Sequence, residues 1–254
     1  MKDWYTDFYA KAPFSKAHIT FCEQVYGKNL CQHGFMDMEQ LHKLLEALDL
    51  TEESVVLDLG CGNGMIAEYI SDCAGAHVYG MDYIPVAIEQ ALERTKAKAA
   101  HLTFQVGDIN AIDYPADFFD VILSIDTLYF GEIDHILSQL APVLKPKGRI
   151  AAFYGIALWE DETLTKDNLA ADRTPLALSL DRHNFTYRTW NFTDADYRHA
   201  QRRLEVLAAL KAQFETEDIQ FIYQNRLDEA NGTIKTSEEG NCSRFLYLAE
   251  KRQT

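Results

Sequence analysis

The chain has 254 residues, and its 39 aspartates and glutamates outnumber its 24 lysines and arginines, which leaves a formal net charge of −15. So acidic a chain is poorly suited to holding a phosphate backbone, and a nucleic-acid partner is not expected. Hydrophobic residues make up 47% and charged residues 25%. This composition is that of a globular protein with a buried core, and it excludes collagen-like and disordered chains.

Cysteine usage and the lengths of the apolar runs indicate the cellular compartment of the protein. The five cysteines form no C-x-x-C pair and no cluster with histidine at zinc-finger spacing, which favours a reduced cytoplasmic protein without a metal site. The amino terminus carries charges throughout and has no signal-peptide core. The longest apolar-rich run, 151–159, is too short to span a bilayer. We therefore expect neither secretion nor a membrane partner.

The first fifty residues are rich in aromatic side chains and end in an amphipathic stretch. Leu41, Leu44 and Leu48 recur there at helical spacing. Residues 1–50 are predicted to form a helical lid segment beside or over a core that begins later in the chain.

From residue 51 onward, apolar runs and helical patterns alternate. Such alternation with short connections predicts a parallel sheet covered by helices on both faces. The strands are expected at 55–57, 77–81, 102–106, 119–124 and 149–153. The helices are expected at 65–71, 85–98 and 133–144. Residues 51–155 thus form a predicted Rossmann-like core.

The alternation stops after Gly155. Residues 156–192 are polar, contain scattered aromatics and show no strand period, so they are predicted to be an insertion on the substrate side of the core. A long helix then follows through Phe214, with Thr193 and Asp196 as its capping pair.

The final segment, 193–254, is expected to close the same core. After its helix, strands are predicted at 219–225 and 243–249, on either side of a turn-rich stretch. The fold class is therefore α/β, with a seven-stranded sheet of five parallel strands and an antiparallel closing hairpin.

A glycine-rich loop, 60–64, lies between the first strand and the first helix of the alternation. Glycines let the backbone turn sharply and approach a ligand closely. Alone, the loop also fits a tight turn without a ligand, or a dinucleotide site. The dinucleotide pattern G-x-G-x-x-G requires a third glycine where this chain has Met65, so that match is poor.

Acidic residues follow two of the predicted strands. Asp82 ends the second strand and Asp108 comes directly after the third. Taken singly, each could be a solvated loop aspartate or a helix cap. The carboxyl ends of parallel strands share one crevice, however, so these acids and the glycine loop are expected to converge on a ligand there.

Five segments, in this order, carry a family resemblance: VVLDLGCGNG, GMDYIP, VGDIN, FFDVILSIDTLYF and LKPKGRIAAFYG. Together they resemble the ordered motifs of the class I S-adenosylmethionine-dependent methyltransferases, over about residues 54–155. The resemblance implies S-adenosyl-L-methionine as cofactor and methyl transfer by in-line displacement, for which alignment of the acceptor and exclusion of water supply much of the catalysis. The expected acceptor is a small molecule, methylated at nitrogen or oxygen.

The resemblance also implies roles for individual residues. In that family the glycine loop lies against the methionine part of the cofactor, which implies backbone contacts from Gly60, Gly62 and Gly64. Asp82 would accept hydrogen bonds from both ribose hydroxyls, and Asp108 would meet the adenine amino group. The remaining implied cofactor residues are Asp58, Cys61, Tyr83, Ile84, Ile109 and Ser124.

Two residues are candidates for the chemistry itself. Asp126 follows the fourth strand, where this fold presents its motif to the transferred methyl, and it could orient an acceptor, take its proton, or equally cap the next turn. His33 lies in an N-terminal segment that in small-molecule members often folds over the cofactor. A lone histidine beside a glycine is more often structural.

Three rival functions remain open at this point. An NAD-dependent oxidoreductase is disfavoured by the missing third glycine. A non-catalytic protein would keep the cofactor fold without turnover, and an RNA methyltransferase would keep the chemistry and change the partner.

Overall fold

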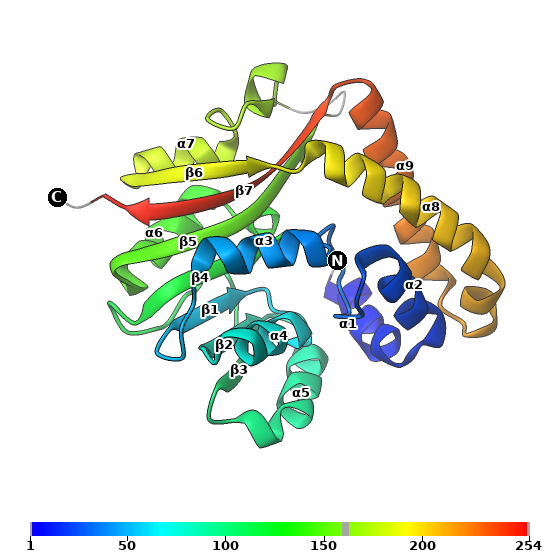
Figure 1. The fold of residues 1–254 in the computed structure, drawn as a ribbon, viewed down its shortest axis with the longest axis horizontal. Coiled ribbons are helices and arrows are strands. Elements are labelled where there is room, and N and C mark those ends of the chain that lie inside the picture. Colours follow the sequence, from blue (N-terminus) through cyan, green and yellow to red (C-terminus); the bar gives the residue numbers. More distant parts are fainter. Residues whose placement is uncertain (1, 159–162, 253–254) are drawn as a thin grey trace.

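The computed structural model describes residues 2–158 and 163–252. Figure 1 shows a twisted sheet with helices on both faces and a further group of helices beside one end of its strands. Within the described ranges the sheet has seven strands, in the order β3-β2-β1-β4-β5-β7-β6. The predicted α/β fold class and seven-stranded sheet are confirmed.

The parallel part of the sheet follows the predicted alternation. Its strands are β1 (Val55–Leu59), β2 (His77–Asp82), β3 (Leu102–Val106), β4 (Phe119–Ile125) and β5 (Leu144–Ala157). β1 pairs with β2 and β4, β2 with β3, and β4 with β5, all in parallel. Strands buried on both faces are apolar along most of their length, and this made them visible in the sequence.

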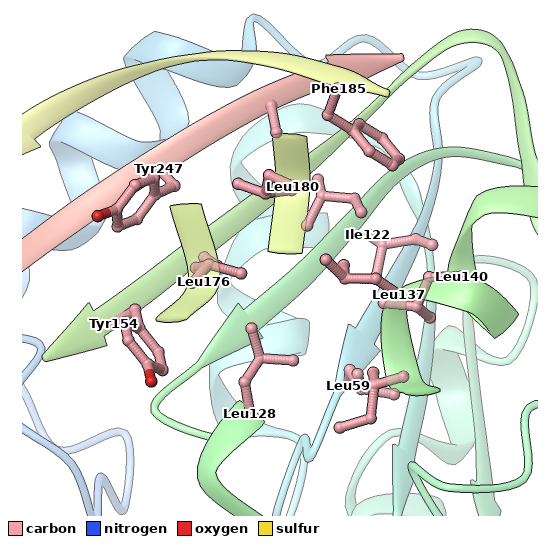
Figure 2. Packing of buried hydrophobic residues seen from close by; sticks show 14 of the residues in the cluster. Leu59, Ile122, Leu128, Leu137, Leu140, Tyr154, Leu176, Leu180, Phe185 and Tyr247 are labelled. Carbon is pink, nitrogen blue, oxygen red and sulfur yellow. The ribbon is translucent and has the colours of Figure 1, made fainter. Parts of the chain in front are cut away.

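Helices cover both faces of this sheet. On one face lie α3 (Met38–Leu48), α4 (Met65–Ala74) and α5 (Pro85–Arg94). On the other lie α6 (Ile133–Val143) and α7 (Pro175–Arg182), whose leucines meet Ile122 of β4 and Tyr247 in the cluster shown in Figure 2. Short 3-10 helices are η1 (Ala12–Phe14), η2 (Lys96–Lys98), η3 (Leu128–Phe130) and η4 (Lys166–Leu169).

The two closing strands are β6 (Phe185–Asn191) and β7 (Cys242–Lys251), with β7 antiparallel to both β5 and β6. The strand predicted at 219–225 is wrong, because Ile219 is the N-cap residue of α9 (Gln220–Glu238) and the rest of the segment lies in this helix. Three of its four buried positions, Ile222, Arg226 and Ala230, recur every four residues, and the arginine among them hides the helical period.

The prediction of an insertion over 156–192 is also wrong where the structure describes it. Its β6 is an edge strand whose outer positions are polar, so the strand period was weak. Leu176, Leu180 and Phe185 from this segment are buried in the core beneath the sheet rather than on the substrate side. Residues 159–162 lie outside the described residues.

A group of four helices, the helical cap, lies beside the carboxyl ends of the parallel strands (Figure 1). It consists of α1 (Lys2–Lys11), α2 (Lys16–Tyr26), α8 (Thr193–Thr216) and α9. Phe8, Phe21, Leu207 and Phe214 are buried together inside it. The predicted lid segment 1–50 is therefore divided, since α1 and α2 belong to the cap whereas α3 covers the sheet.

The long helix through Phe214 is confirmed, but its predicted capping pair is wrong. Neither side chain caps α8. The Thr193 hydroxyl accepts a hydrogen bond from the Arg244 backbone N–H, and the Asp196 carboxylate accepts one from the Gln40 side-chain amide, so both are used to attach α8 to its neighbours.

Candidate active site

A cavity of about 510 Å³, here called the first chamber, lies at the carboxyl ends of β1, β2 and β4. Its size is that of a small-molecule site. The predicted site residues in its wall are His33, Asp58, Gly60, Cys61, Gly62, Asp82, Tyr83, Ile84, Asp108, Ile109 and Asp126. The folded chain therefore brings most of the predicted residues to one crevice, from segments that are far apart in sequence.

The glycine loop is held against the end of β2. Gly60 and Cys61 donate backbone hydrogen bonds to the Met81 carbonyl at 2.8 and 3.1 Å. Gly62 has a φ of 56°, and a β carbon there would collide with the Tyr9 hydroxyl of α1. Glycine at this position thus lets α1 close over the loop.

Two predicted contact residues do not reach the chamber wall. Gly64 begins α4 with a φ of 74°, and a β carbon on it would meet Phe104 and Ala91, so it permits close packing of helix on sheet. Ser124 is fully buried within β4, and its hydroxyl has no hydrogen-bond partner among the described residues. Neither residue belongs to the wall of the chamber.

Asp82 connects the loop to the next helix. One carboxylate oxygen accepts from the Gly62 N–H at 2.8 Å and the other from the Ile84 N–H at 2.9 Å. Burial raises its pKa, whereas these backbone hydrogen bonds oppose the shift. A carboxylate has about four acceptor positions, so each oxygen retains capacity for a ligand hydroxyl.

The other two acids of the first chamber differ in environment. Asp58 is buried, and desolvation together with the charge of Asp82 raises its pKa to about 7. Asp108 is exposed, and hydrogen bonds from the backbone and side chain of Asn110 lower its pKa. The chamber thus combines a readily protonated acid at its floor with an ionised one at its rim.

A smaller cavity of about 310 Å³, the second chamber, adjoins the first. The two share Tyr5, His33, Gly34, Asp126, Tyr129 and Phe130. The second chamber extends between α8, α9 and β7, where its charged wall residues are Asp196, Glu229 and Arg244. Desolvation by burial raises the pKa of Asp196 to about 7.

Asp126, predicted as a catalytic candidate, is held by an ion pair. Arg244 of β7 donates to both of its carboxylate oxygens, and the Phe35 backbone N–H donates to one of them at 3.2 Å. The Arg244 Nε lies 3.3 Å from Asp196, which balances the guanidinium from a second side. A β carbon on Gly34 would collide with the Asp126 carboxylate, so glycine permits this approach.

Two fully buried arginines hold the backbone around His33. Arg203 of α8 donates to the Gly34 carbonyl at 2.6 Å, and Arg226 of α9 donates to the His33 carbonyl at 2.6 Å. Glu229 faces both guanidinium groups, at 2.9 and 3.3 Å. This network attaches the segment that carries His33 to the helical cap.

The His33 side chain lies between the two chambers. Its ring meets Trp4, Tyr5 and Phe8 edge-on, with centroids 5.0 to 5.5 Å apart. Desolvation, aided by the charge of Arg226, lowers its pKa to about 3, so the imidazole is neutral near pH 7. Its Nε2 lies 3.8 Å from Oε1 of Glu229.

Four charged residues line the second chamber or hold the backbone beside it and were not predicted from the sequence: Arg203, Arg226, Glu229 and Arg244. One signal was available. Ala200, Leu207 and Phe214 recur every seven residues on the buried face of α8, and Arg203 falls on that same face. A charged residue on an apolar face needs a buried partner, which indicates an ion pair.

The sequence profile of a methyltransferase-domain family matches residues 50–191, more than half of the chain. The chain belongs to this family. The matched segment contains the glycine loop, Asp82, Asp108 and Asp126. The matched domain thus supplies the strand-end side of the first chamber, whereas α1, the segment around His33, α8, α9 and β7 lie outside the matched residues.

Relatives of this methyltransferase domain act on different acceptors. Phosphoethanolamine N-methyltransferase 1 of Arabidopsis thaliana is 30% identical over 144 residues, covering 56% of this chain and 29% of the relative. The 27-O-demethylrifamycin SV methyltransferase of Amycolatopsis mediterranei is 30% identical over 148 residues, covering 53% and 54%. The match thus spans about half or less of these relatives.

A solved structure shares the fold over nearly the whole chain. It is Haemonchus contortus phosphoethanolamine N-methyltransferase 2 in complex with phosphomonomethylethanolamine and S-adenosylhomocysteine, with a TM-score of 0.75 and 20% identity. The likeness covers 98% of this chain and 60% of that one. The shared fold therefore includes the helical cap.

Two other kinds of site are absent from the described residues. No group of three or more His, Cys, Asp or Glu side chains in these ranges is placed to hold a metal ion. Within the same ranges, every helix is too short or too polar to cross a membrane.

Proposed function

We propose that the protein transfers a methyl group from S-adenosylmethionine to a small-molecule acceptor at nitrogen or oxygen. The observation that carries this proposal is the glycine loop bound to Asp82 at the floor of the first chamber. A buried carboxylate there, with free acceptor positions beside close-packed backbone, suits a ribose. Membership of the methyltransferase-domain family supports the same chemistry.

The residues of the first chamber fit this cofactor. Asp82 would accept from the ribose hydroxyls, Asp108 from the adenine amino group, and Asp58 would lie near the methionine ammonium. Tyr83, Ile84 and Ile109 would line the adenine. Gly60, Cys61 and Gly62 would lie along the methionine part of the cofactor, and Gly64 and Ser124 would lie behind the chamber wall. The bound cofactor supplies an electrophilic methyl on a sulfonium, and the chain aligns an acceptor with it and excludes water.

We infer that the acceptor occupies the second chamber and that Asp126 is a positioning residue. Its carboxylate already neutralises Arg244 and accepts from the Phe35 backbone, so removing a substrate proton would break an existing ion pair. Through these contacts it fixes the loop after β4 against the segment that carries His33. Asp126→Asn should therefore affect acceptor turnover more than cofactor affinity.

We further propose that α1 is the moving part of the predicted lid segment. Lys2, Tyr5 and Tyr9 from this helix line the first chamber, so a bound cofactor would be enclosed beneath it. The acidity of the chain favours a small molecule over a nucleic acid as partner. Five unpaired cysteines favour a reducing compartment such as the cytoplasm.

Calorimetric titration with S-adenosylhomocysteine and with NAD tests the cofactor assignment. S-adenosylhomocysteine should bind and NAD should give no heat. Tight binding of NAD together with no binding of S-adenosylhomocysteine would instead support an oxidoreductase. Retention of S-adenosylhomocysteine without methyl transfer to any acceptor would indicate a non-catalytic protein, and label confined to RNA would indicate an RNA methyltransferase.

A further inference from the structure

The boundary between the two chambers contains two polar atoms with unused bonding capacity. Among the described residues, the buried His33 Nε2 has no hydrogen-bond partner. Glu229 uses its Oε2 for both buried arginines, whereas its Oε1 faces the imidazole. An unpartnered buried nitrogen is costly, so a ligand that bonds to it would be favoured.

The spacing of these atoms indicates what fits between them. At 3.8 Å they are too far apart for a direct hydrogen bond. A primary amine placed beside both can donate one N–H to each and keep its lone pair for the methyl group. We propose that His33 and Glu229 form the acceptor subsite, and that the acceptor is a small primary amine without a phosphate group.

The surrounding charges favour the reactive form of an amine. The carboxylates of Glu229 and Asp126, which face this site, are each already paired with buried arginines, so neither is left to balance the charge of an ammonium ion. The burial that keeps His33 neutral also disfavours an ammonium ion beside it. The amine is therefore bound as the free base, which is the nucleophile that methylation requires.

Phosphate groups in proteins are commonly bound by lysine and arginine side chains, and the second chamber offers no free one in the part of the chain that the structure describes. Lys2 lies in the wall of the first chamber, over the Tyr83 ring. The sole cationic side chain in the wall of the second chamber, Arg244, is paired with Asp126 and faces Asp196. Arg203 and Arg226 are fully buried and engaged with Glu229 and backbone carbonyls. Residues 1, 159–162 and 253–254 contain no lysine or arginine.

This inference rests on the proposed function and narrows its acceptor. In the reaction, the amine nitrogen forms a bond to the methyl carbon while the bond from that carbon to sulfur breaks, and its electron pair stays on sulfur. S-adenosylmethionine becomes S-adenosylhomocysteine. The secondary ammonium product then loses its extra proton to solvent.

The test uses the whole chain with methyl-labelled S-adenosylmethionine and a low-molecular-weight cell extract. The labelled product is isolated, treated with alkaline phosphatase, and identified by mass spectrometry. We expect an N-methylated amine whose chromatographic mobility the phosphatase leaves unchanged. A phosphatase-sensitive product, a product methylated at oxygen or carbon, or no labelled small molecule would overturn the inference. Failure to bind S-adenosylhomocysteine in a parallel titration would instead count against the proposed function.

Variants on α9 sharpen this test once the amine is identified. Glu229→Gln should lower kcat/KM roughly 10- to 150-fold, the effect of losing a hydrogen bond to a charged group, with S-adenosylhomocysteine affinity unchanged. The control is Asp228→Asn, an exposed carboxylate on the same helix, which should leave both constants unchanged. Equal kinetics for the two variants would place the acceptor elsewhere, and the product's identity decides the inference even if Glu229→Gln does not fold.

Discussion

The two chambers are built in different ways. The first is built on loops at the ends of neighbouring strands and covered by α1 and the segment around His33. Its key contacts are backbone groups, such as the Gly62 and Ile84 N–H groups on Asp82. The second is formed by segments far apart in sequence, held by buried charged side chains, chiefly Arg244 on Asp126. Loss of a single side chain should therefore affect ligand affinity in the first and folding stability in the second.

The largest effect is expected from Arg244→Met. The change leaves Asp126 and Asp196 without their cation in a buried setting, which costs about 3–5 kcal/mol of unfolding free energy. Urea denaturation measures this, and Arg252→Met is the matched control, because its exposed ion pair with Asp181 is long, at 3.5 Å. Equal stability of the two variants would mean that charge pairing does not hold the second chamber together.

Asp82→Ala should act mainly on the ligand. Loss of hydrogen bonds between this carboxylate and the ribose should weaken S-adenosylhomocysteine binding by about 1.5–3 kcal/mol. Calorimetry on the folded variant gives the value. Because the carboxylate also accepts hydrogen bonds from Gly62 and Ile84, we also expect a loss of unfolding free energy, smaller than the loss of binding free energy. Unchanged affinity would show that the ribose lies elsewhere.

The difference between the two chambers explains why only the first could be predicted from the sequence. A glycine loop after an apolar strand and an acid at the next strand end are local patterns, so the first chamber was predictable. The pairing of Arg244 with Asp126 joins positions 118 residues apart, and no local pattern encodes it. Buried Arg226 also interrupted the apolar period of α9, so a helix was mistaken for a strand.

The pKa values of Asp58 at the floor of the first chamber and Asp108 at its rim are shifted in opposite directions, so ligand binding should depend on pH through Asp58. Asp58 has a pKa of about 7 without ligand, raised by burial and by Asp82. A ligand ammonium beside it favours the ionised carboxylate, so lowering the pH from 8 to 6 should weaken S-adenosylhomocysteine binding by up to about tenfold per pH unit. Asp58→Asn should remove most of this slope. A flat profile in the unmodified protein would place the ammonium away from Asp58.

The smallest expected effect concerns motion of α1. Hydrogen exchange of its amides should slow several-fold when S-adenosylhomocysteine binds, because Tyr9 of this helix closes on the glycine loop. Helix α3 packs on the sheet and serves as an internal reference whose exchange should not change. Equal exchange of α1 in the two states would make it a fixed wall.

A crystal structure of the protein with S-adenosylhomocysteine tests most directly whether the first chamber holds the cofactor and leaves the second chamber for the acceptor. We expect both ribose hydroxyls to bond to the Asp82 carboxylate and the sulfur to point toward His33 and Glu229 at the boundary. A ligand whose ribose is away from Asp82, or whose adenosine occupies the space between α9 and β7, would contradict this expectation.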